Sequence, residues 1–483
     1  MKTPEERRDF GSGGAWAYRI FFFLGLGNLF PWNTFITASY YFADRFCGTS
    51  FESNFENYFA ITFTACQTIG DYTNVYIPTL SIISLIRISC HHQGLALTIL
   101  YCEFWSLDSK VTYPLIVYSL IFLITTIMVD VFIDANIFFD LTLTLTALSG
   151  LCGSLLSAGI FGMAAYFPFE YTGALMSGQG VAGLAVSLSS LLTSMASSSI
   201  DICDDDDGST EDDSSCENHL SYSALAYFSI ATAVLICCII SFQTLKRLSI
   251  TRYYLGKGDL DDDHSFNAIS TTAELPKQLS VGLLDNEIMG GGQSWKSEIP
   301  DTDGSITAIF RLIWIPAVSV FLGFTVTIGI FPAAFVQLQS EYQCHANSNR
   351  FYNDLFVPFL FVVFNLFDLT GRVCAEKFQP LLNKKNILQF ALLRFLFIPL
   401  ILLCNVSDSQ LPVVFLNDSF PIIFEILFAL TNGYLAAAAM MIGPTLVSSK
   451  DSGTAGTIMI FCLTLGLMGG SGLSFLVMYI SQG

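Results

Sequence analysis

Long apolar runs, separated by short polar segments, cover most of this chain. A transmembrane α-helix needs about 20 predominantly apolar residues, and windows of that kind occur eleven times. The pattern therefore predicts an all-α polytopic membrane protein with 11 transmembrane helices. We expect these helices near residues 16–43, 57–87, 112–133, 141–167, 173–199, 220–245, 306–338, 351–375, 386–405, 419–447 and 452–480.

Two long polar segments interrupt the apolar pattern. Residues 200–219 are acidic and predict a solvated outer loop, and residues 246–305 predict a disordered cytoplasmic linker. The linker separates six spans from five, which is typical of a two-bundle transporter. The expected organisation is a tail, a first bundle, the linker and a second bundle, at residues 1–15, 16–245, 246–305 and 306–483. Residues 90–110 are too polar and too short for a clear span, and an interfacial helix is the alternative.

Composition and charge agree with a membrane protein. Of the 483 residues 53% are hydrophobic and only 13% are charged, whereas soluble domains carry about 25% charged residues. The net charge of −19 indicates no nucleic-acid partner, because much of the acid lies in the two polar segments. With the amino terminus inside, the outer loops hold only Arg45 and Arg350, as the positive-inside rule predicts. Eleven spans then place the carboxyl terminus outside.

Loop residues offer two kinds of covalent modification and little metal chemistry. Two sequons, at Asn405 and Asn417, fall in the outer loop between spans nine and ten and are candidate glycosylation sites. The five histidines lie in loops without HExxH spacing, so we expect no metal, no cofactor and no enzyme activity. Four loop cysteines are disulfide candidates whose pairing the sequence leaves open: Cys47, Cys203, Cys216 and Cys344.

Glycines in the fourth and fifth spans predict close helix packing. The segment from Gly178 to Gly183 matches GxGxxG by its letters, but no strand precedes it. Inside an apolar run, glycines at this spacing let neighbouring helices approach closely. Gly153, Gly178 and Gly183 are therefore predicted packing positions.

The segment from Phe361 to Val373 places charge where charge is costly. Asn365, Asp368 and Arg372 lie at i, i+3 and i+7 and share one face of a helix. An ionised group at the centre of a lipid-facing helix costs roughly 2.5 to 3.5 kcal/mol. The cost is smaller where the face lines a cavity and two charges compensate each other. We interpret Asp368 and Arg372 as part of a polar pathway, and the alternative is a salt bridge that only joins two helices.

Prolines interrupt several spans beside polar or aromatic residues. Pro31 kinks the first span; there Asn33 can satisfy a freed carbonyl and Trp32 offers a flat face to a planar solute. Phe331 and the following proline break the seventh span, and broken helices are typical of midplane transport sites. Glu425 is a lone acid in the tenth span. A titrating Glu425 would allow proton coupling, whereas a capped or water-facing carboxylate is the commoner case.

Seven segments, in order along the chain, resemble segments of the equilibrative nucleoside transporter family. The resemblance implies eleven helices in a six-plus-five, major-facilitator-like arrangement, and passive nucleoside exchange without ATP. The segments are GLGNLFPWNTFITASYYF (25–42), PFEYTGALMSGQGVAG (168–183), FTVTIGIFPA (324–333), FNLFDLTGR (364–372), RFLFIPLILLCN (394–405), TNGYLAAAAMMIGP (431–444) and TAGTIMIFCLTLGL (454–467).

The resemblance also implies roles for individual residues. Trp32 matches the family's cavity tryptophan beside the base, and Asp368 with Arg372 matches the pair expected to bind ribose hydroxyls, with Asn365 next to them. Positions near the cavity and its gates are matched by Ile36, Phe331 and Phe361, with Asn33 beside them.

One position departs from the family pattern. In LCGSLLSAGIFG (151–162), Ser157 stands where the family usually has a glutamine that reaches the nucleobase. Serine is shorter and has one donor, so base recognition is expected to change, through water or through Gln179.

The sequence therefore predicts a facilitative transporter of nucleosides, with nucleobases as further candidates, in the plasma membrane and acting as a monomer. The rival within the transporter class is an organic-cation or nucleobase carrier of the same fold, with or without proton coupling. The organic-cation carrier is the rival that residues of the fifth span can test. Such a carrier is expected to place an acid in the fifth span, and residues 173–199 contain none. A heptahelical receptor is disfavoured by the span count, and an enzyme by the lack of a second reactive constellation.

Overall fold

The computed structural model describes most of both predicted bundles. Several sequence predictions lie outside the described residues: the acidic loop at 200–219 with Cys203 and Cys216, most of 90–110, and most of the linker. The described residues are 12–49, 51, 55–76, 107–131, 133–196, 222–259, 304–344, 349–378, 383–407 and 409–482.

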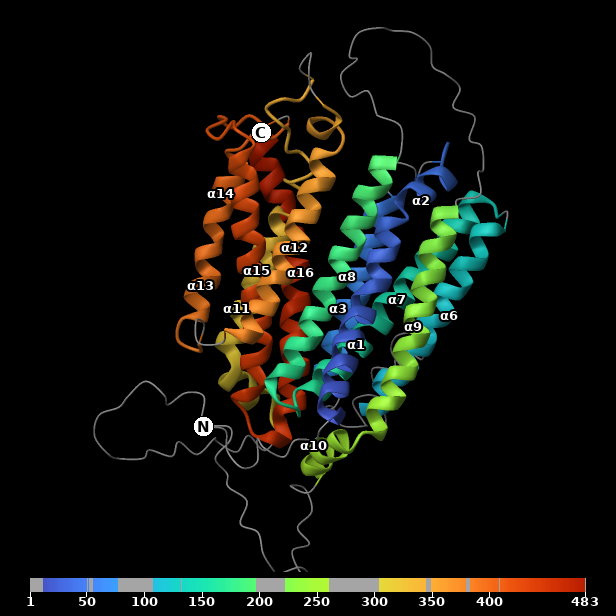
Figure 1. Ribbon diagram of the computed structural model, residues 1–483, viewed down its shortest axis with the longest axis vertical. Helices are drawn as coiled ribbons and strands as arrows, with labels where there is room; N and C mark the ends of the chain where they lie inside the picture. Colours follow the sequence, from blue (N-terminus) through green and yellow to red (C-terminus); the bar gives the residue numbers. More distant parts are fainter. Residues whose placement is uncertain are drawn as a thin grey trace, which may run out of the picture.

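The described chain is helical, and its helices form two groups that lie side by side (Figure 1). The first group consists of α1 (Ser12–Thr37), α2 (Ser39–Arg45), α3 (Phe55–Tyr76), α6 (Leu107–Asp130), α7 (Ala135–Ala164), α8 (Phe169–Ala196), α9 (Tyr222–Arg247) and α10 (Ser249–Asp259). The second group consists of α11 (Ile306–Ile330), η2 (Arg350–Tyr352), α12 (Phe356–Lys377), α13 (Ile387–Leu393), η4 (Arg394–Leu396), α14 (Phe397–Leu402), α15 (Ser419–Thr445), η5 (Ser449–Asp451) and α16 (Ser452–Gln482).

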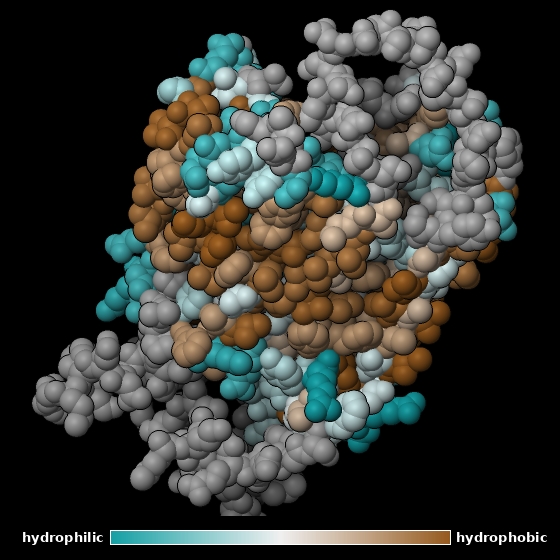
Figure 2. Space-filling model, turned by 45° about the horizontal axis from the view of Figure 1, so that its top comes forward, coloured by the Kyte–Doolittle hydropathy of each residue, from teal (hydrophilic) through white to brown (hydrophobic). Residues whose placement is uncertain are grey.

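Eight of the described helices are long and apolar enough to cross a membrane. They are α6, α7, α8, α9, α11, α12, α15 and α16. The helices α1 and α3 have 26 and 22 residues and are not among these eight. Ile387–Leu402 forms a shorter apolar segment. Figure 2 shows an apolar belt across one face of the molecule, with hydrophilic residues towards both ends. This distribution is that of an integral membrane protein.

Two segments depart from the expected pattern. The range predicted to be a disordered linker begins with a helix, α10, which lies at the end of the molecule opposite α2 and the end of α16 (Figure 1). The residues Ser249–Asp259 form an amphipathic helix, because Ile250 is buried against the first group while Arg252 is exposed. The ninth predicted span, 386–405, is divided into α13, η4 and α14.

Reciprocal glycines let pairs of helices cross closely. Where α1 meets α8, a side chain on Gly25 would collide with the carbonyl of Leu175, and one on Gly178 with the carbonyl of Phe22. Such small-residue crossings bring helix backbones together in membranes. Between the groups, α8 packs on α12 and α15, and α16 packs on α3 and α7.

Disulfides form on the side of the molecule that carries α2. Cys47, just after α2, and Cys344, between α11 and η2, are each disulfide-bonded. Two of the four predicted disulfide cysteines are therefore confirmed.

Candidate functional site

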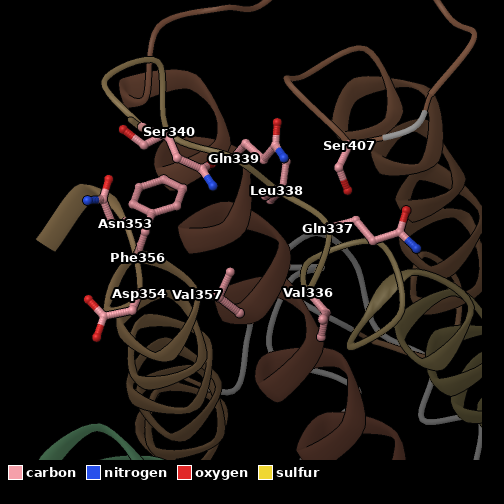
Figure 3. Close-up of a pocket in the computed structure, with 11 residues that line it drawn as sticks. Val336, Gln337, Leu338, Gln339, Ser340, Asn353, Asp354, Phe356, Val357 and Ser407 are labelled. Atoms are coloured by element: carbon pink, nitrogen blue, oxygen red, sulfur yellow. The ribbon is translucent and has the colours of Figure 1, made fainter. Parts of the chain in front are cut away.

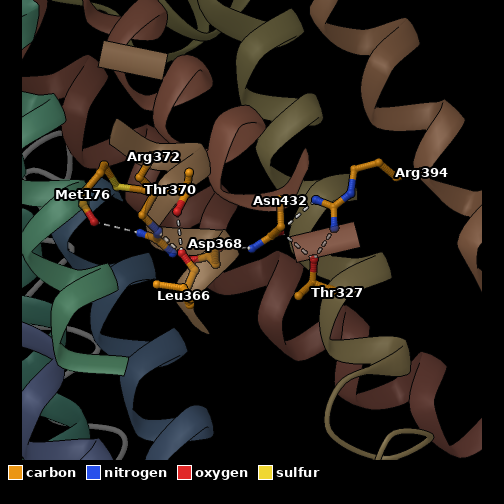
Figure 4. A network of polar contacts seen from close by, with 8 residues as sticks. All are labelled: Met176, Thr327, Leu366, Asp368, Thr370, Arg372, Arg394 and Asn432. Atoms are coloured by element: carbon orange, nitrogen blue, oxygen red, sulfur yellow. Dashed lines mark hydrogen bonds and ion pairs between the residues drawn. The ribbon is translucent and has the colours of Figure 1, made fainter. Parts of the chain in front are cut away.

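The most polar buried region of the second group is centred on Asp368 and Arg372 of α12. Arg372 Nε donates to Asp368 Oδ2 at 2.7 Å, and the two residues are 7% and 5% exposed. The i, i+4 spacing brings the two side chains together on one helix face. Arg372 Nη1 also donates to the carbonyl oxygen of Met176 in α8, at 3.1 Å (Figure 4). The guanidinium therefore links the second group of helices to the first.

The other carboxylate oxygen of Asp368 is held from α15. Asn432 Nδ2 donates to Asp368 Oδ1 at 2.7 Å, and the amide oxygen of Asn432 accepts from Arg394 Nη1 at 2.8 Å and from Thr327 Oγ1 at 2.6 Å (Figure 4). Arg394 Nη2 donates to Thr327 Oγ1 at 2.9 Å. Because an amide nitrogen only donates, these bonds fix the orientation of Asn432 towards the carboxylate.

Arg394 is the most deeply buried cation of this network. It is 2% exposed, and its guanidinium stacks over the ring of Phe428 at 4.9 Å. A buried cation requires a compensating charge or several acceptors, and Arg394 receives them from α11 and α15. Sequence reasoning assigned no role to Arg394, Asn432 or Thr327. An arginine inside the apolar run 386–405 was the available signal.

Small residues of α8 form the wall opposite α12. A Cβ on Gly180 would lie 3.1 Å from Arg372 Cδ, and one on Gly183 would collide with Asn365 Oδ1. Asn365 itself donates to the carbonyl of Phe361, one turn back along α12, at 2.8 Å. Gly180 and Gly183 therefore let α8 lie directly over the polar face of α12.

The predicted aromatic face lies on the first group. Trp32 of α1 stacks on Phe63 of α3, with ring centroids 4.3 Å apart and planes inclined by 21°. Phe63 covers one face of the indole. Ser157 of α7 is 4% exposed and donates to Asn28 Oδ1 of α1 at 3.1 Å. Ser157 is thus bonded within the first group.

The predicted gate residues fall into separate places. Phe331 follows directly after α11. Its ring centroid lies 3.9 Å from that of Phe364, on which it stacks, and 4.7 Å from that of Phe361. Asn33 and Gln179 are partly buried on α1 and α8. Ile36 lies in α1, and its side chain is outside the described part.

The remaining predicted positions lie away from the network. Gly153 of α7 faces the Tyr118 hydroxyl, which a Cβ would approach to 2.8 Å. Asn405 donates to the carbonyl of Gln339 at 3.0 Å. Asn417 is exposed next to the start of α15.

A cavity of about 200 Å³ opens near the end of the second group that carries η2 (Figure 3). Its lining includes Gln337, Ser340, Asp354 and Ser407, and none of the residues of the buried network. This cavity is therefore separate from Asp368 and Arg372.

Polar contacts also join the two groups near both ends of the bundle. Tyr18 of α1 donates to both carboxylate oxygens of Glu376 in α12, at 2.8 and 2.9 Å. Arg350 of η2 donates to the carbonyls of Ser194 and Met195 at the end of α8, and its Nε pairs with Asp354 at 2.8 Å. A cation at a helix carboxyl end is favourable because the last carbonyls lack helix partners.

Besides Asp368, the acids Asp71 and Glu425 are buried in long helices. Asp71 of α3 accepts from Thr464 of α16 at 2.7 Å and so connects the two groups. Glu425 of α15 has no exposed surface, and both its carboxylate oxygens lack a hydrogen-bond partner in the described chain. The expectation of a capped or water-facing Glu425 was wrong, because the helix face that carries it points into the second group.

Within the described ranges, no group of three or more His, Cys, Asp or Glu side chains could hold a metal ion. The polar network is instead a set of donors and acceptors: one carboxylate, two guanidinium groups, an amide and a hydroxyl. Such a set can form charge-assisted hydrogen bonds with a polar solute.

This chain is similar to known transporters along most of its length. The family model for nucleoside transporters matches residues 143–479. Equilibrative nucleoside transporter 1 of Rattus norvegicus is 34% identical over 95% of this chain and 96% of its own length, and that of Homo sapiens is 34% identical over 95% of each. Equilibrative nucleoside transporter 2 of Mus musculus is 32% identical over 94% of this chain and 95% of its own. The crystal structure of the major facilitator superfamily transporter FucP, in the outward conformation, superposes with a TM-score of 0.52 at 11% identity. It covers 98% of this chain and 92% of that one, and shows likeness of fold alone.

Proposed function

Because the chain belongs to the nucleoside transporter family, we propose that it carries nucleosides passively across a membrane. The observation that carries the proposal is the buried pair of Asp368 and Arg372 on α12, with Arg372 also bonded to α8. Ribose has adjacent hydroxyls that each donate and accept a hydrogen bond. A carboxylate that accepts and a guanidinium that donates match that pattern with charge-assisted bonds.

The bond between Arg372 and Met176 supports a mechanism of alternating access. That bond joins the two groups, and a ribose held by Asp368 and Arg372 would add a second link between them. Substrate then contributes to the contact between the groups, so that occupancy favours one arrangement over another. The bond from Asn432 keeps the Asp368 carboxylate in place while the substrate binds and leaves.

Base recognition is assigned to the first group. Trp32 offers the face that Phe63 leaves uncovered, and base–aromatic stacking tolerates both purines and pyrimidines. Ser157 is bonded to Asn28, so it reaches a base only through water or after a change of partner. We therefore expect broad selectivity for the base, with nucleobases as weaker substrates.

The membrane arrangement is part of the proposal. The eight long apolar helices together with α1, α3 and Ile387–Leu402 would give eleven crossings, six before the linker and five after it. The amino terminus and α10 would be cytoplasmic, and the end of α16, with the sequons at Asn405 and Asn417, would be extracellular. The protein would act as a monomer in the plasma membrane.

The test is uptake of radiolabelled adenosine and uridine in cells without nucleoside transport of their own, with Arg372→Ala as the variant. Removing one partner of a buried ion pair costs about 3 to 5 kcal/mol, so uptake should fall at least tenfold at equal surface amount. Arg311→Ala is the matched control, since Arg311 is an exposed arginine on α11, and it should transport like the unmodified protein.

Two results would count against the proposal. Normal uptake by well-expressed Arg372→Ala would remove the pair from substrate binding. Absence of nucleoside uptake and of counterflow by the unmodified protein at the cell surface would overturn the transport function. Competition by excess nucleobase in the same assay ranks nucleobases against nucleosides.

A further inference from the structure

Glu425 is a buried acid for which nucleoside binding has no use. It lies in α15 with no exposed surface, and neither carboxylate oxygen has a hydrogen-bond partner in the described chain. One turn further along α15, Phe428 packs against the rings of Phe335, Phe364 and Phe397. An ionised carboxylate in such surroundings is far less stable than a protonated one. The carboxyl group is therefore uncharged in this arrangement.

Arg394 contacts the same stretch of α15. Its guanidinium stacks on the ring of Phe428 and donates to the Phe428 carbonyl and to Asn432. Glu425, Phe428 and Asn432 lie at i, i+3 and i+7, on one face of the helix. Arg394 Nε is also buried, and no described residue accepts a hydrogen bond from it. An unpaired donor thus lies beside the same helix face as two unpaired acceptor oxygens.

Other charged groups on the helices packed against α15 are already paired or distant. Asp368 and Arg372 of α12 bond to each other, and Glu376 of the same helix bonds to Tyr18. Asp418, at the start of α15, accepts from Ser340 and Glu341. The remaining charged residues of the helices around α15 lie near helix ends: Glu170 of α8, Arg311 of α11 and Lys377 of α12. The helices α13, α14 and α16 contain no charged residue.

We propose that Glu425 is a proton-binding site, and that loss of its proton draws Arg394 away from Asn432 and weakens nucleoside binding at Asp368. The ionised carboxylate would satisfy the free Arg394 Nε and compete for the guanidinium with the Asn432 amide oxygen. Asn432 then loses the bond that orients it, and Asp368 loses its fixed donor. The link to nucleosides rests on the proposed function, whereas the binding of a proton by Glu425 does not.

The first measurement is the pH dependence of nucleoside affinity in proteoliposomes that contain the purified full chain, with equal pH on both sides. The apparent KM for adenosine should rise about fivefold or more when the pH is raised from about 5.5 to about 8.5, both above the ordinary pKa of glutamate. Glu425→Gln should keep a low KM across the range. Glu425→Met, of similar volume and without a polar group, should do the same and replaces Glu425→Gln if that variant does not fold.

Asp140→Asn is the control, since it removes an exposed acid of α7. It should keep the pH dependence of the unmodified protein, because Asp140 lies on the first group of helices, whereas the polar network is centred on α12 and α15. A KM that is independent of pH in the unmodified protein, or an equal pH dependence in Glu425→Gln, overturns the link to nucleoside binding.

The second measurement is thermal unfolding in detergent without nucleoside. Over this pH range the native chain holds a proton on Glu425, whereas a glutamate of the unfolded chain, with an ordinary pKa of about 4.3, has already released it. The unfolding temperature should therefore fall as pH rises. Glu425→Met should flatten that slope. Equal slopes in the two proteins overturn proton binding at Glu425, even if the unmodified protein transports nucleosides. If the unmodified protein does not transport nucleosides but its unfolding temperature depends on pH more steeply than that of Glu425→Met, only the proposed function is contradicted.

Discussion

At the residue scale, the position of the Asp368 carboxylate, which we propose to bind ribose, depends on side chains from three other segments. Asp368 and Arg372 are four residues apart on one helix, so their contact could be predicted from spacing alone. The outer part of the network could not. Asn432 is 38 residues from Arg394 and 105 from Thr327, and only the packing of α11, η4 and α15 brings these polar groups together.

The role of Asn432 can be tested with Asn432→Ala. This change leaves Asp368 Oδ1 and Arg394 Nη1 without their bonds, and a lost hydrogen bond to a charged group costs about 1.5 to 3 kcal/mol. The apparent KM for adenosine should rise about tenfold or more, measured as initial uptake rates at equal surface amount. Thr431→Ala removes a hydroxyl that bonds only to its own helix and should leave KM unchanged. An unchanged KM in Asn432→Ala would mean that Asp368 is positioned without the amide.

At the element scale, the apolar runs predicted where the long helices lie, because burial in lipid demands continuous apolar sequence. They did not predict the division of 386–405 into α13, η4 and α14, where Arg394 turns into the network. They also did not predict α10, whose amphipathic pattern is short and lies within polar sequence. The close approach of α12 and α15 was not predicted either. It depends on Gly371 and Gly433, each of which lies against the backbone of the other helix in the folded protein.

The crossing of α12 and α15 can be tested with Gly433→Ala. A Cβ on Gly433 would collide with the backbone carbonyl of Asp368, so the two helices must separate next to the polar network. Overpacking typically costs about 1 to 3 kcal/mol, and both the unfolding temperature and adenosine uptake should fall. Gly472→Ala is the matched control on α16, because a Cβ there would meet nothing within 4 Å. Equal unfolding temperatures for the two variants would show that the helices can yield at this crossing.

At the scale of the whole molecule, the two groups of helices are joined at both ends as well as at the network. Tyr18 and Glu376 form the join near α10, and Arg350 with the end of α8 forms the join near η2. A transporter that alternates must break one join while the other holds. Sequence reasoning placed Arg350 in an outer loop but gave it no partner, because its acceptors are backbone carbonyls, which sequence patterns do not distinguish.

The two joins predict opposite responses to two single changes. Tyr18→Phe removes both bonds to Glu376, and at about 1.5 to 3 kcal/mol for a bond to a charged group it should favour opening near α10. Amide hydrogen exchange should then rise in the first turns of α1 and the last turns of α12, and stay constant at the end of α8. Arg350→Ala should give the converse pattern, with faster exchange at the end of α8 and in η2.

Each variant is the control for the other, because both remove polar contacts of one side chain between the same two groups. A general loosening of the protein would raise exchange at both ends in both variants. A reciprocal pattern requires that the groups move against each other about a region that stays in contact, and the bond from Arg372 to Met176 lies in the described part between the two joins. Adenosine should therefore lower exchange at Met176 in both variants, since it binds the residues that hold this contact. If adenosine slows exchange at only one end and leaves Met176 unchanged, the substrate acts at that join and the central pair is a structural bridge.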